Sequence, residues 1–248
     1  EAAADIGGQL NLARRVPGKE EFDGLVAWYR TMLGASRVQL RLGTRAGAAA
    51  LDSYDEVIVA TGVTPRDPGI PGQDQSHVAS YIQVLTRAVT PGPRVAVVGA
   101  GGIGFDVAEF LVQGRPSPTE DLPHWLKDWG VADPSDRPGG LADAAPAPSL
   151  RQVTLMQRKA EKPGRSLGKT TGWIHRATLA AKGVRMIGGL NYEAITPGGV
   201  LVSHGEAREN PELIAADTIV LCAGQLSNRS LADDLIARLA NQQTIRIV

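Results

Sequence analysis

Three glycines at positions 99, 101 and 104 separate an apolar run at 94–98 from a helix-like pattern at 105–111. This order predicts a buried parallel strand, a tight turn and the start of a helix. Gly99 would permit the turn, Gly101 would let the backbone approach a pyrophosphate, and Gly104 would let the helix press against the strand. Glycines also occur in loops that only need a positive φ, but here the flanking strand and helix favour a dinucleotide-binding turn.

Two basic residues, Arg158 and Lys159, follow the next predicted strand at 151–156. In a dinucleotide-binding unit, an NAD site places an acidic residue here, on the ribose hydroxyls. Arg and Lys instead suit a ribose 2′-phosphate, because Arg offers a planar fork of donors and both carry full positive charge. Taken alone they could be a solvated pair, but beside the glycine turn they predict NADP(H).

Other candidate residues give weaker signals. Glu1 precedes a glycine pair and stands where a flavin-binding fold has its ribose-binding acid, although a solvent-facing terminal residue is the simpler interpretation. Cys222 is the single cysteine and lies in an apolar run, which predicts a buried, unreactive thiol. His175 has no evident acid partner and is predicted to be structural. The run 164–170 imitates a phosphate-binding loop but has the wrong glycine spacing and follows no strand, so we reject a nucleoside triphosphatase.

Composition excludes several classes of function. The 248 residues hold 26 basic and 26 acidic side chains, so no net field favours a nucleic-acid or membrane partner. One cysteine excludes a disulfide framework or an iron–sulfur cluster built from this chain alone. No apolar segment approaches the roughly 20 residues of a membrane span and no signal peptide opens the chain, so we expect a cytoplasmic protein.

Further elements follow from local patterns. Helical spacing predicts helices at 25–33, 124–129, 173–179 and 231–239. Strands are predicted at 37–42, 54–62, 183–187, 198–202, 218–223 and 244–248, and a strand leading into a helix at 78–85. The segment 114–149 is rich in proline and is predicted to be mostly irregular. Because the chain starts without methionine and the run 244–248 has no evident partner, we expect part of a longer polypeptide.

The order of these parts predicts an α/β fold with two dinucleotide-binding (Rossmann-like) domains. Residues 1–92 plus 226–248 would form a partial FAD-binding domain, and residues 93–225 an NADPH-binding domain inserted into it. A pyridine nucleotide lying against a flavin performs hydride transfer. The cofactors carry that chemistry, so no catalytic side chain is predicted.

Several motifs together resemble the C-terminal part of the bacterial NADPH-dependent 2,4-dienoyl-CoA reductases, and the resemblance covers nearly the whole chain. The most specific run is 168–176, Gly-Lys-Thr-Thr-Gly-Trp-Ile-His-Arg, and the others lie at 7–9, 17–22, 99–106, 157–160, 162–164 and 222–225. The resemblance implies FAD contacts at Glu1, Gln9, Lys19, Ala46 and Gly62. It implies NADPH contacts at Gly99, Gly101, Gly104, Arg158 and Lys159.

The resemblance also implies a larger enzyme that reduces a 2,4-dienoyl-CoA in the β-oxidation of unsaturated fatty acids. Such an enzyme has an N-terminal barrel that holds FMN and a 4Fe-4S cluster, and electrons pass from NADPH through FAD and the cluster to FMN. The barrel, its catalytic residues and the cluster cysteines are absent from this sequence. This chain alone is therefore expected not to reduce a dienoyl-CoA.

Two alternatives remain open. An electron-transfer flavoprotein of the trimethylamine dehydrogenase type has the same architecture but does not use NADPH, so Arg158 and Lys159 argue against it. A non-catalytic nucleotide-binding module would bind NADPH without reducing a flavin. A stand-alone disulfide reductase is excluded, because it would need a pair of cysteines and Cys222 is the single cysteine of this chain.

Overall fold

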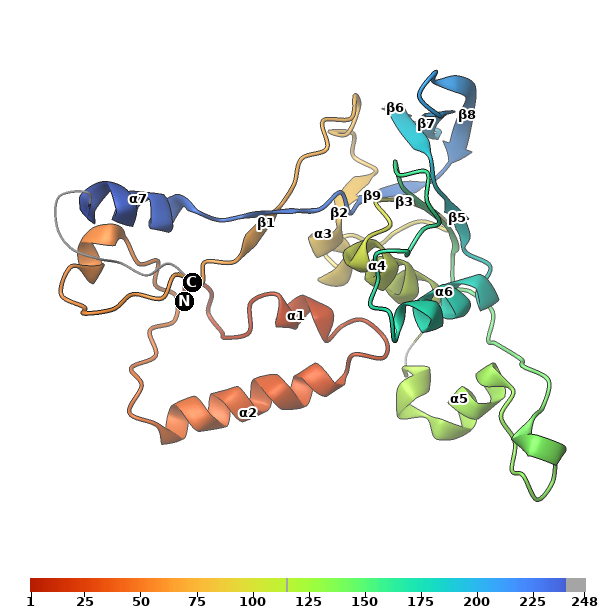
Figure 1. The fold of residues 1–248 in the computed structure, drawn as a ribbon, viewed down its shortest axis with the longest axis horizontal. Helices are drawn as coiled ribbons and strands as arrows, with labels where there is room; N and C mark the ends of the chain where they lie inside the picture. The colour runs from red at the N-terminus through yellow and green to blue at the C-terminus, as the bar shows by residue number, and fades with distance from the viewer. Residues whose placement is uncertain (115, 240–248) are drawn as a thin grey trace. The chain divides into compact units, whose positions relative to one another are not determined.

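Strand β3 (Arg94–Val98) lies at the centre of a five-stranded sheet in which every neighbouring pair is parallel. In the computed structural model, which describes residues 1–114 and 116–239, the strand order is β2-β9-β3-β4-β5 (Figure 1). The other strands are β2 (Val78–Ser80), β4 (Gln152–Met156), β5 (Arg185–Ile187) and β9 (Thr218–Leu221). The parallel strands predicted near 78, 94, 151, 183 and 218 are thereby confirmed.

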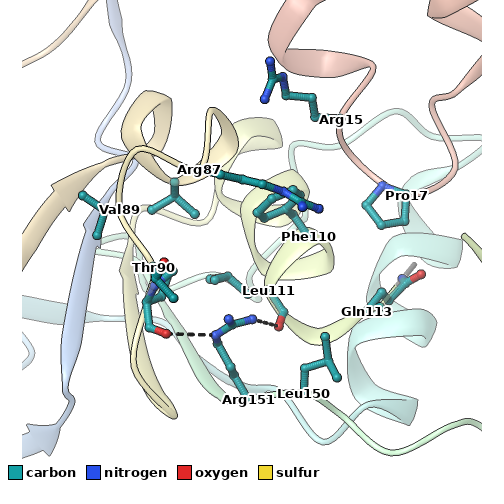
Figure 2. A pocket seen from close by; sticks show the side chains of 13 residues that line it. Arg15, Pro17, Arg87, Val89, Thr90, Phe110, Leu111, Gln113, Leu150 and Arg151 are labelled. Atoms are coloured by element: carbon teal, nitrogen blue, oxygen red, sulfur yellow. Dashed lines mark hydrogen bonds between the residues drawn. The ribbon is translucent and has the colours of Figure 1, made fainter. Parts of the chain in front are cut away.

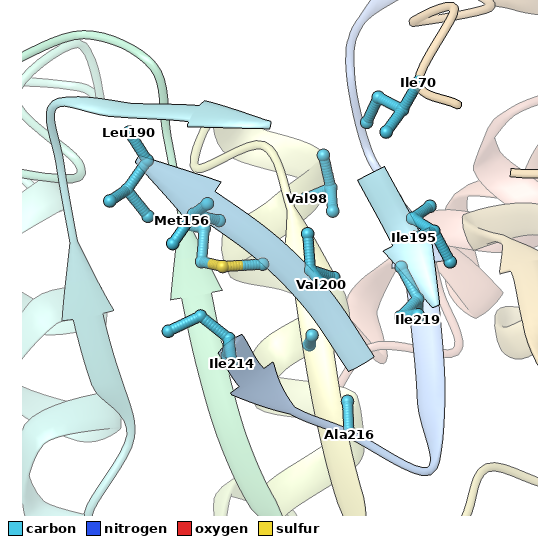
Figure 3. Packing of buried hydrophobic residues seen from close by; sticks show 11 residues of the cluster. Ile70, Val98, Met156, Leu190, Ile195, Val200, Ile214, Ala216 and Ile219 are labelled. Carbon is cyan, nitrogen blue, oxygen red and sulfur yellow. The ribbon is translucent and has the colours of Figure 1, made fainter. Parts of the chain in front are cut away.

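The two faces of this sheet are covered by different layers. Helix α4 (Gly102–Val112) packs on β3 and β4 and contacts α3 (Tyr81–Leu85) and α6 (Gly172–Ala181). A three-stranded antiparallel sheet covers the other face; it comprises β6 (Leu190–Thr196), β7 (Gly199–His204) and β8 (Glu209–Ala215). Ala96 and Val98 of β3 join Val200 and Ile214 of this second sheet in one buried cluster (Figure 3). Because side chains alternate along a strand, Val95 and Val97 face the helices.

The proline-rich segment between α4 and β4 is irregular apart from three short helices. These are η2 (Pro118–Glu120), α5 (Leu122–Trp129) and η3 (Pro138–Gly140). The rings of Trp125 and Trp129 lie 6.2 Å apart, as their four-residue spacing predicts. The carboxylate of Asp128 lies 3.3 Å from Lys182 Nζ, and both side chains are buried. This ion pair fastens α5 to the end of α6.

The chain folds as two compact units whose limits differ from the predicted domains. The first unit comprises residues 1–13, 21–66 and 225–248, and the second comprises residues 14–20 and 67–224. The predicted boundary at 92/93 lies inside the second unit, because β2 pairs with β9. Residues 14–20 also belong to the second unit, since Lys19 forms an ion pair with Asp106. Among the described residues, no helix is long and apolar enough to cross a membrane.

The first unit has fewer strands than its sequence predicts. Its elements are α1 (Leu10–Ala13), α2 (Glu21–Ala35), η1 (Ala48–Leu51), β1 (Val63–Pro65), β10 (Gln225–Ser227) and α7 (Ser230–Leu239). Helices α2 and α7 confirm the predicted ones. The strands predicted at 37–42 and 54–62 are wrong, because neither segment has a strand beside it among the described residues, where β1 pairs only with β10. The strand predicted at 244–248 lies outside the described residues.

We predict that Gly104→Ala destabilises the second unit by about 3 kcal/mol or more. A Cβ atom at this position would overlap the carbonyl oxygen of Gly99, which is backbone and cannot move aside without shifting α4. Urea unfolding monitored by circular dichroism measures the loss. Gly24→Ala in α2 is the matched control: its Cβ meets nothing within 4 Å, so we expect a gain of about 0.5–1 kcal/mol. Equal effects of the two changes would contradict this account of the turn.

Candidate nucleotide-binding site

The turn after β3 is formed by a glycine in a conformation that other residues rarely adopt. Gly99 has φ +115°, and a Cβ atom there would overlap the carbonyl oxygen of Cys222 at the end of β9. Its amide donates a hydrogen bond of 2.8 Å to the carbonyl of Met156 on β4. The turn is thus held between the ends of β4 and β9. Cys222 is buried, as predicted, and burial raises the pKa of its thiol.

Gly104 and Gly101 have different roles in the turn: the first allows close packing of α4, and the second leaves the backbone open to a ligand. Gly104 lets α4 approach the carbonyl of Gly99, where no side chain fits. Gly101 is the N-cap of α4, has φ −83°, and a Cβ there would meet no protein atom within 4 Å. Its backbone therefore faces open space at the positive end of an eleven-residue helix. Such a place suits the pyrophosphate of a dinucleotide.

Arg158 and Lys159 lie at the same edge of the sheet as the glycine turn. Strands β3 and β4 are parallel and pair Val98 with Met156, so both chains leave the sheet side by side. The Lys159 side chain is 76% exposed and lies 3.7 Å from Glu161. Arg158 is exposed and forms no ion pair with a described residue. Both predicted phosphate-binding side chains are therefore accessible beside the turn.

Tyr192 is a polar residue that the sequence did not single out. Its hydroxyl is buried and has no hydrogen-bond partner among the described residues. Burial raises the pKa of this hydroxyl, and the positive charge of Arg158 acts on it in the opposite direction. An unpaired buried hydroxyl costs about 1–3 kcal/mol, which a bound polar group would recover. The amide of Leu190, two residues before Tyr192, donates to the carbonyl of Gln157 over 3.2 Å, so β6 begins next to the segment that carries Arg158.

Lys19 was predicted to contact FAD, but the structure pairs it with a residue of α4. Its Nζ atom lies 2.6 and 2.7 Å from the two carboxylate oxygens of Asp106. Asp106 is close to the N-terminus of α4, where a negative charge would repel a pyrophosphate. Lys19 offsets that charge and keeps the turn attractive to anions. The predicted contact of Lys19 with FAD stays a prediction.

His175 has an acid partner that its sequence neighbourhood does not reveal. A hydrogen bond of 2.7 Å joins its Nδ1 atom on α6 to Oε1 of Glu109 on α4, and the Glu109 side chain is only 6% exposed. The hydrogen bond to Glu109 raises the pKa of His175. Burial raises the pKa of Glu109, against the opposing effect of His175. The pair fixes α6 to α4 one helical turn beyond Asp106.

The other predicted flavin contacts lie in the first unit. Glu1 is exposed, and hydrogen bonds join residues 1–3 to residues 43–44, close to Ala46. Gln9 accepts a hydrogen bond of 3.5 Å from Gln225. Gly62 has φ +73°, and a Cβ there would meet nothing within 4 Å. These residues are accessible to a ligand, and their role toward FAD stays a prediction.

The chain belongs to the pyridine nucleotide-disulphide oxidoreductase family, whose model matches residues 9–247. Members of this family are flavin-dependent oxidoreductases that bind FAD and NAD(P)H. The predicted α/β fold with Rossmann-like nucleotide-binding domains is thereby confirmed. The glycine turn with its open Gly101 fits the pyridine nucleotide of such a protein.

Individual relatives differ in their reactions. An N,N-dimethylglycine/sarcosine dehydrogenase of Chromohalobacter salexigens is 37% identical over 45% of this chain and 17% of its own length. A metal reductase of Desulforamulus reducens is 24% identical over 93% of this chain and 34% of its own length. The chain thus spans about a third of the length of one of these relatives and about a sixth of the other.

Solved structures share the fold at low sequence identity. A 2-naphthoyl-CoA reductase has a TM-score of 0.71 at 19% identity, over 94% of this chain and 30% of its own. Histamine dehydrogenase from Rhizobium sp. 4-9 has a TM-score of 0.70 at 19% identity, over 100% of this chain and 36% of its own. These similarities establish the fold and leave the substrate open.

We predict that Gly101→Ala leaves stability within about 0.5 kcal/mol of the unaltered chain but weakens pyridine nucleotide binding about tenfold or more. The added methyl group fits the N-cap conformation, yet occupies the space through which a pyrophosphate must approach. Calorimetric titration with NADPH measures the affinity. Gly114→Ala, beyond the other end of α4, would meet only Leu150 at 3.9 Å and should change neither quantity. Unchanged affinity in Gly101→Ala would exclude the turn as the binding site.

We predict that Glu109→Gln lowers the pKa of His175 toward its ordinary value of about 6.5. Folding raises the pKa of His175, so protonated His175 stabilises the folded state. This contribution is complete below pH 6.5 and is lost as pH rises through the raised pKa. The unaltered protein should therefore lose stability over that window. Glu109→Gln should remove this dependence and about 1–3 kcal/mol of stability at pH 6.

Histidine NMR titration and urea unfolding at several pH values measure these effects. Glu212→Gln is the control, because His204 and Glu212 form a more exposed pair at 3.6 Å. It should change stability by less than about 1 kcal/mol. The assignment fails if His175 titrates at the same pH in both proteins.

Proposed function

We propose that this chain is the electron-input module of an NADPH-dependent flavoenzyme of the 2,4-dienoyl-CoA reductase type. The observation that carries the nucleotide part is the open N-terminus of α4 at Gly101, with Arg158 and Lys159 exposed at the same sheet edge. A dinucleotide with a ribose 2′-phosphate matches both features. The family supplies the flavin as electron acceptor.

Each part of the site has a separate task in this proposal. Backbone amides at the N-terminus of α4 bind the pyrophosphate, and Arg158 and Lys159 bind the 2′-phosphate. Lys19 offsets the negative charge of Asp106, which would otherwise repel the pyrophosphate. The bound nucleotide supplies a hydride for the flavin. No side chain needs to transfer a proton for that step.

The acyl-CoA part of the proposal rests on the sequence resemblance, above all the run 168–176. In the proposed enzyme, a barrel outside this chain would hold FMN and a 4Fe-4S cluster and would supply the reduction of the 2,4-dienoyl-CoA. Relatives whose whole length is about three to six times the part they share with this chain fit that organisation. Exposed apolar side chains in the first unit support a further packing partner: Ile58 is 77% exposed and Val38 58%.

An amine-oxidising flavoprotein of the trimethylamine dehydrogenase type is the second candidate. It is favoured by the 37% identity to an N,N-dimethylglycine/sarcosine dehydrogenase and by the histamine dehydrogenase fold. In such an enzyme the flavin would be reduced by the amine and not by NADPH. The exposed Arg158 and Lys159 favour the NADPH-dependent enzyme.

We predict that Arg158→Ala weakens NADPH binding at least about tenfold and leaves NADH binding nearly unchanged. The reason is the loss of a charged, planar donor for the 2′-phosphate, which NADH lacks. Titration of both nucleotides measures the preference. Arg165→Ala is the matched control: Arg165 lies in the same loop, is 75% exposed, and pairs with Glu161. An unchanged NADPH preference would contradict the assignment of Arg158.

The intact polypeptide tests the reaction itself. NADPH added without oxygen should bleach the flavin absorbance, and a 2,4-dienoyl-CoA should restore it. Bleaching by sarcosine or another methylamine, with no response to NADPH, would establish the second candidate. Tight NADPH binding without bleaching would indicate a non-catalytic nucleotide-binding module.

A further inference from the structure

A cavity lies at the opposite end of α4 from the glycine turn. Its volume is about 430 Å³, within the range of small-molecule sites. It is formed by the segment 15–17, the C-terminal end of α3 with the segment after it, the C-terminal end of α4 and residues 150–151 just before β4 (Figure 2). Helix α4 has eleven residues and is therefore about 16 Å long. The cavity is separate from the proposed nucleotide site.

Three of the thirteen residues that line this cavity are arginines, and none is acidic. They are Arg15, Arg87 and Arg151. Arg87 and Arg151 form no ion pair with any described residue. Like charges in one cavity repel each other. A bound anion would remove that repulsion.

Arg87 occupies a position where glycine would be the easier choice. It has φ +61° and follows the C-cap of α3, with its amide donating to Val84 over 3.0 Å. A left-handed conformation costs a non-glycine residue about 1–2 kcal/mol. The guanidinium lies 5.8 Å from the centre of the Phe110 ring, over its face (Figure 2). The Arg87 side chain thus lies over the cavity although its backbone conformation is unfavourable for a residue other than glycine.

Arg151 is fixed by backbone carbonyl groups. Its Nε atom donates to Pro91 over 3.3 Å, and its Nη1 atom donates to Leu111 over 3.2 Å (Figure 2). Neutral carbonyls hold the guanidinium in place without cancelling its charge. Its Nη2 atom donates to no described residue. An oxygen anion in the cavity could accept that hydrogen bond at little cost in side-chain entropy.

The rest of the lining is largely apolar. Val84, Val89, Phe110, Leu111 and Leu150 contribute to it. Inorganic phosphate would meet the arginines but leave this wall in water. A carboxylate with a short apolar chain would satisfy both parts of the cavity.

We propose that this cavity binds an organic carboxylate with a short apolar chain. The carboxylate faces Arg87 and Arg151, and the chain lies against Phe110 and Leu150. This site does not depend on the proposed nucleotide chemistry, because it lies at the other end of α4.

Titration of the full chain with hexanoate tests the proposal. Calorimetry gives the affinity, and the NMR signals of the arginine Nε–H groups report the contact. We expect saturable binding, with hexanamide and inorganic phosphate each at least about tenfold weaker. Arg87→Gly should keep or increase stability, because glycine suits φ +61°, and should weaken hexanoate binding at least about tenfold.

Arg208→Gly is the matched control, since Arg208 also has a positive φ, of +53°, and does not line the cavity. It should leave hexanoate affinity unchanged, and NADPH affinity should be the same in both variants. Phosphate binding as tight as hexanoate would overturn the assignment of the apolar chain. The proposed site would be overturned if the full chain shows no saturable binding of hexanoate, or if the Arg87→Gly protein binds hexanoate as tightly as the unaltered chain.

Discussion

The second unit depends on one close backbone contact, between Gly104 at the start of α4 and the carbonyl of Gly99 at the end of β3. No side chain fits there, so α4 can approach the central strand only because position 104 is glycine. This approach sets the direction in which the helix leaves the sheet. It also aims the N-terminal amides of α4 at the open space beside Gly101. The packing contact and the anion-binding geometry are therefore one feature of the backbone.

The acidic side chains of α4 are paired with basic side chains from other segments, so their charge does not oppose anion binding at the N-terminus of the helix. Asp106 places a carboxylate near the N-terminal end of α4, which is the proposed pyrophosphate site, and Glu109 places a second carboxylate about one turn further along the helix. Lys19 offsets the first and His175 the second, at 2.6 and 2.7 Å. Each partner comes from a different segment, so the same contacts that balance charge also fasten residues 14–20 and α6 to α4. At the other end of the helix, Arg87 and Arg151 form no ion pair with a described residue, so positive charge predominates there.

Sequence patterns predicted the parts of this fold whose signals are local. A buried parallel strand is an apolar run in itself, and the glycine turn needs only the six consecutive positions 99–104. Arg158 could be placed beside Gly99 because neighbouring parallel strands end at the same edge. Glu109 and His175 are 66 positions apart, so only the packing of α4 against α6 reveals the pair. The cavity near Arg87 was missed for the same reason, since its lining comes from four separate segments.

The strands wrongly predicted in the first unit show what an apolar pattern cannot specify. Residues 37–42 alternate as a half-buried strand should, yet Val38 is 58% and Leu40 46% exposed. Alternation describes how side chains would divide between two faces of a sheet, but the sheet exists only where a second strand accepts the backbone hydrogen bonds. In the described first unit, β1 and β10 pair with each other, and neither pairs with 37–42. Burying each large apolar side chain would contribute about 1.5–3 kcal/mol. Residues 37–42 therefore have the composition of a strand, but only a second strand or another packing surface would stabilise them as one.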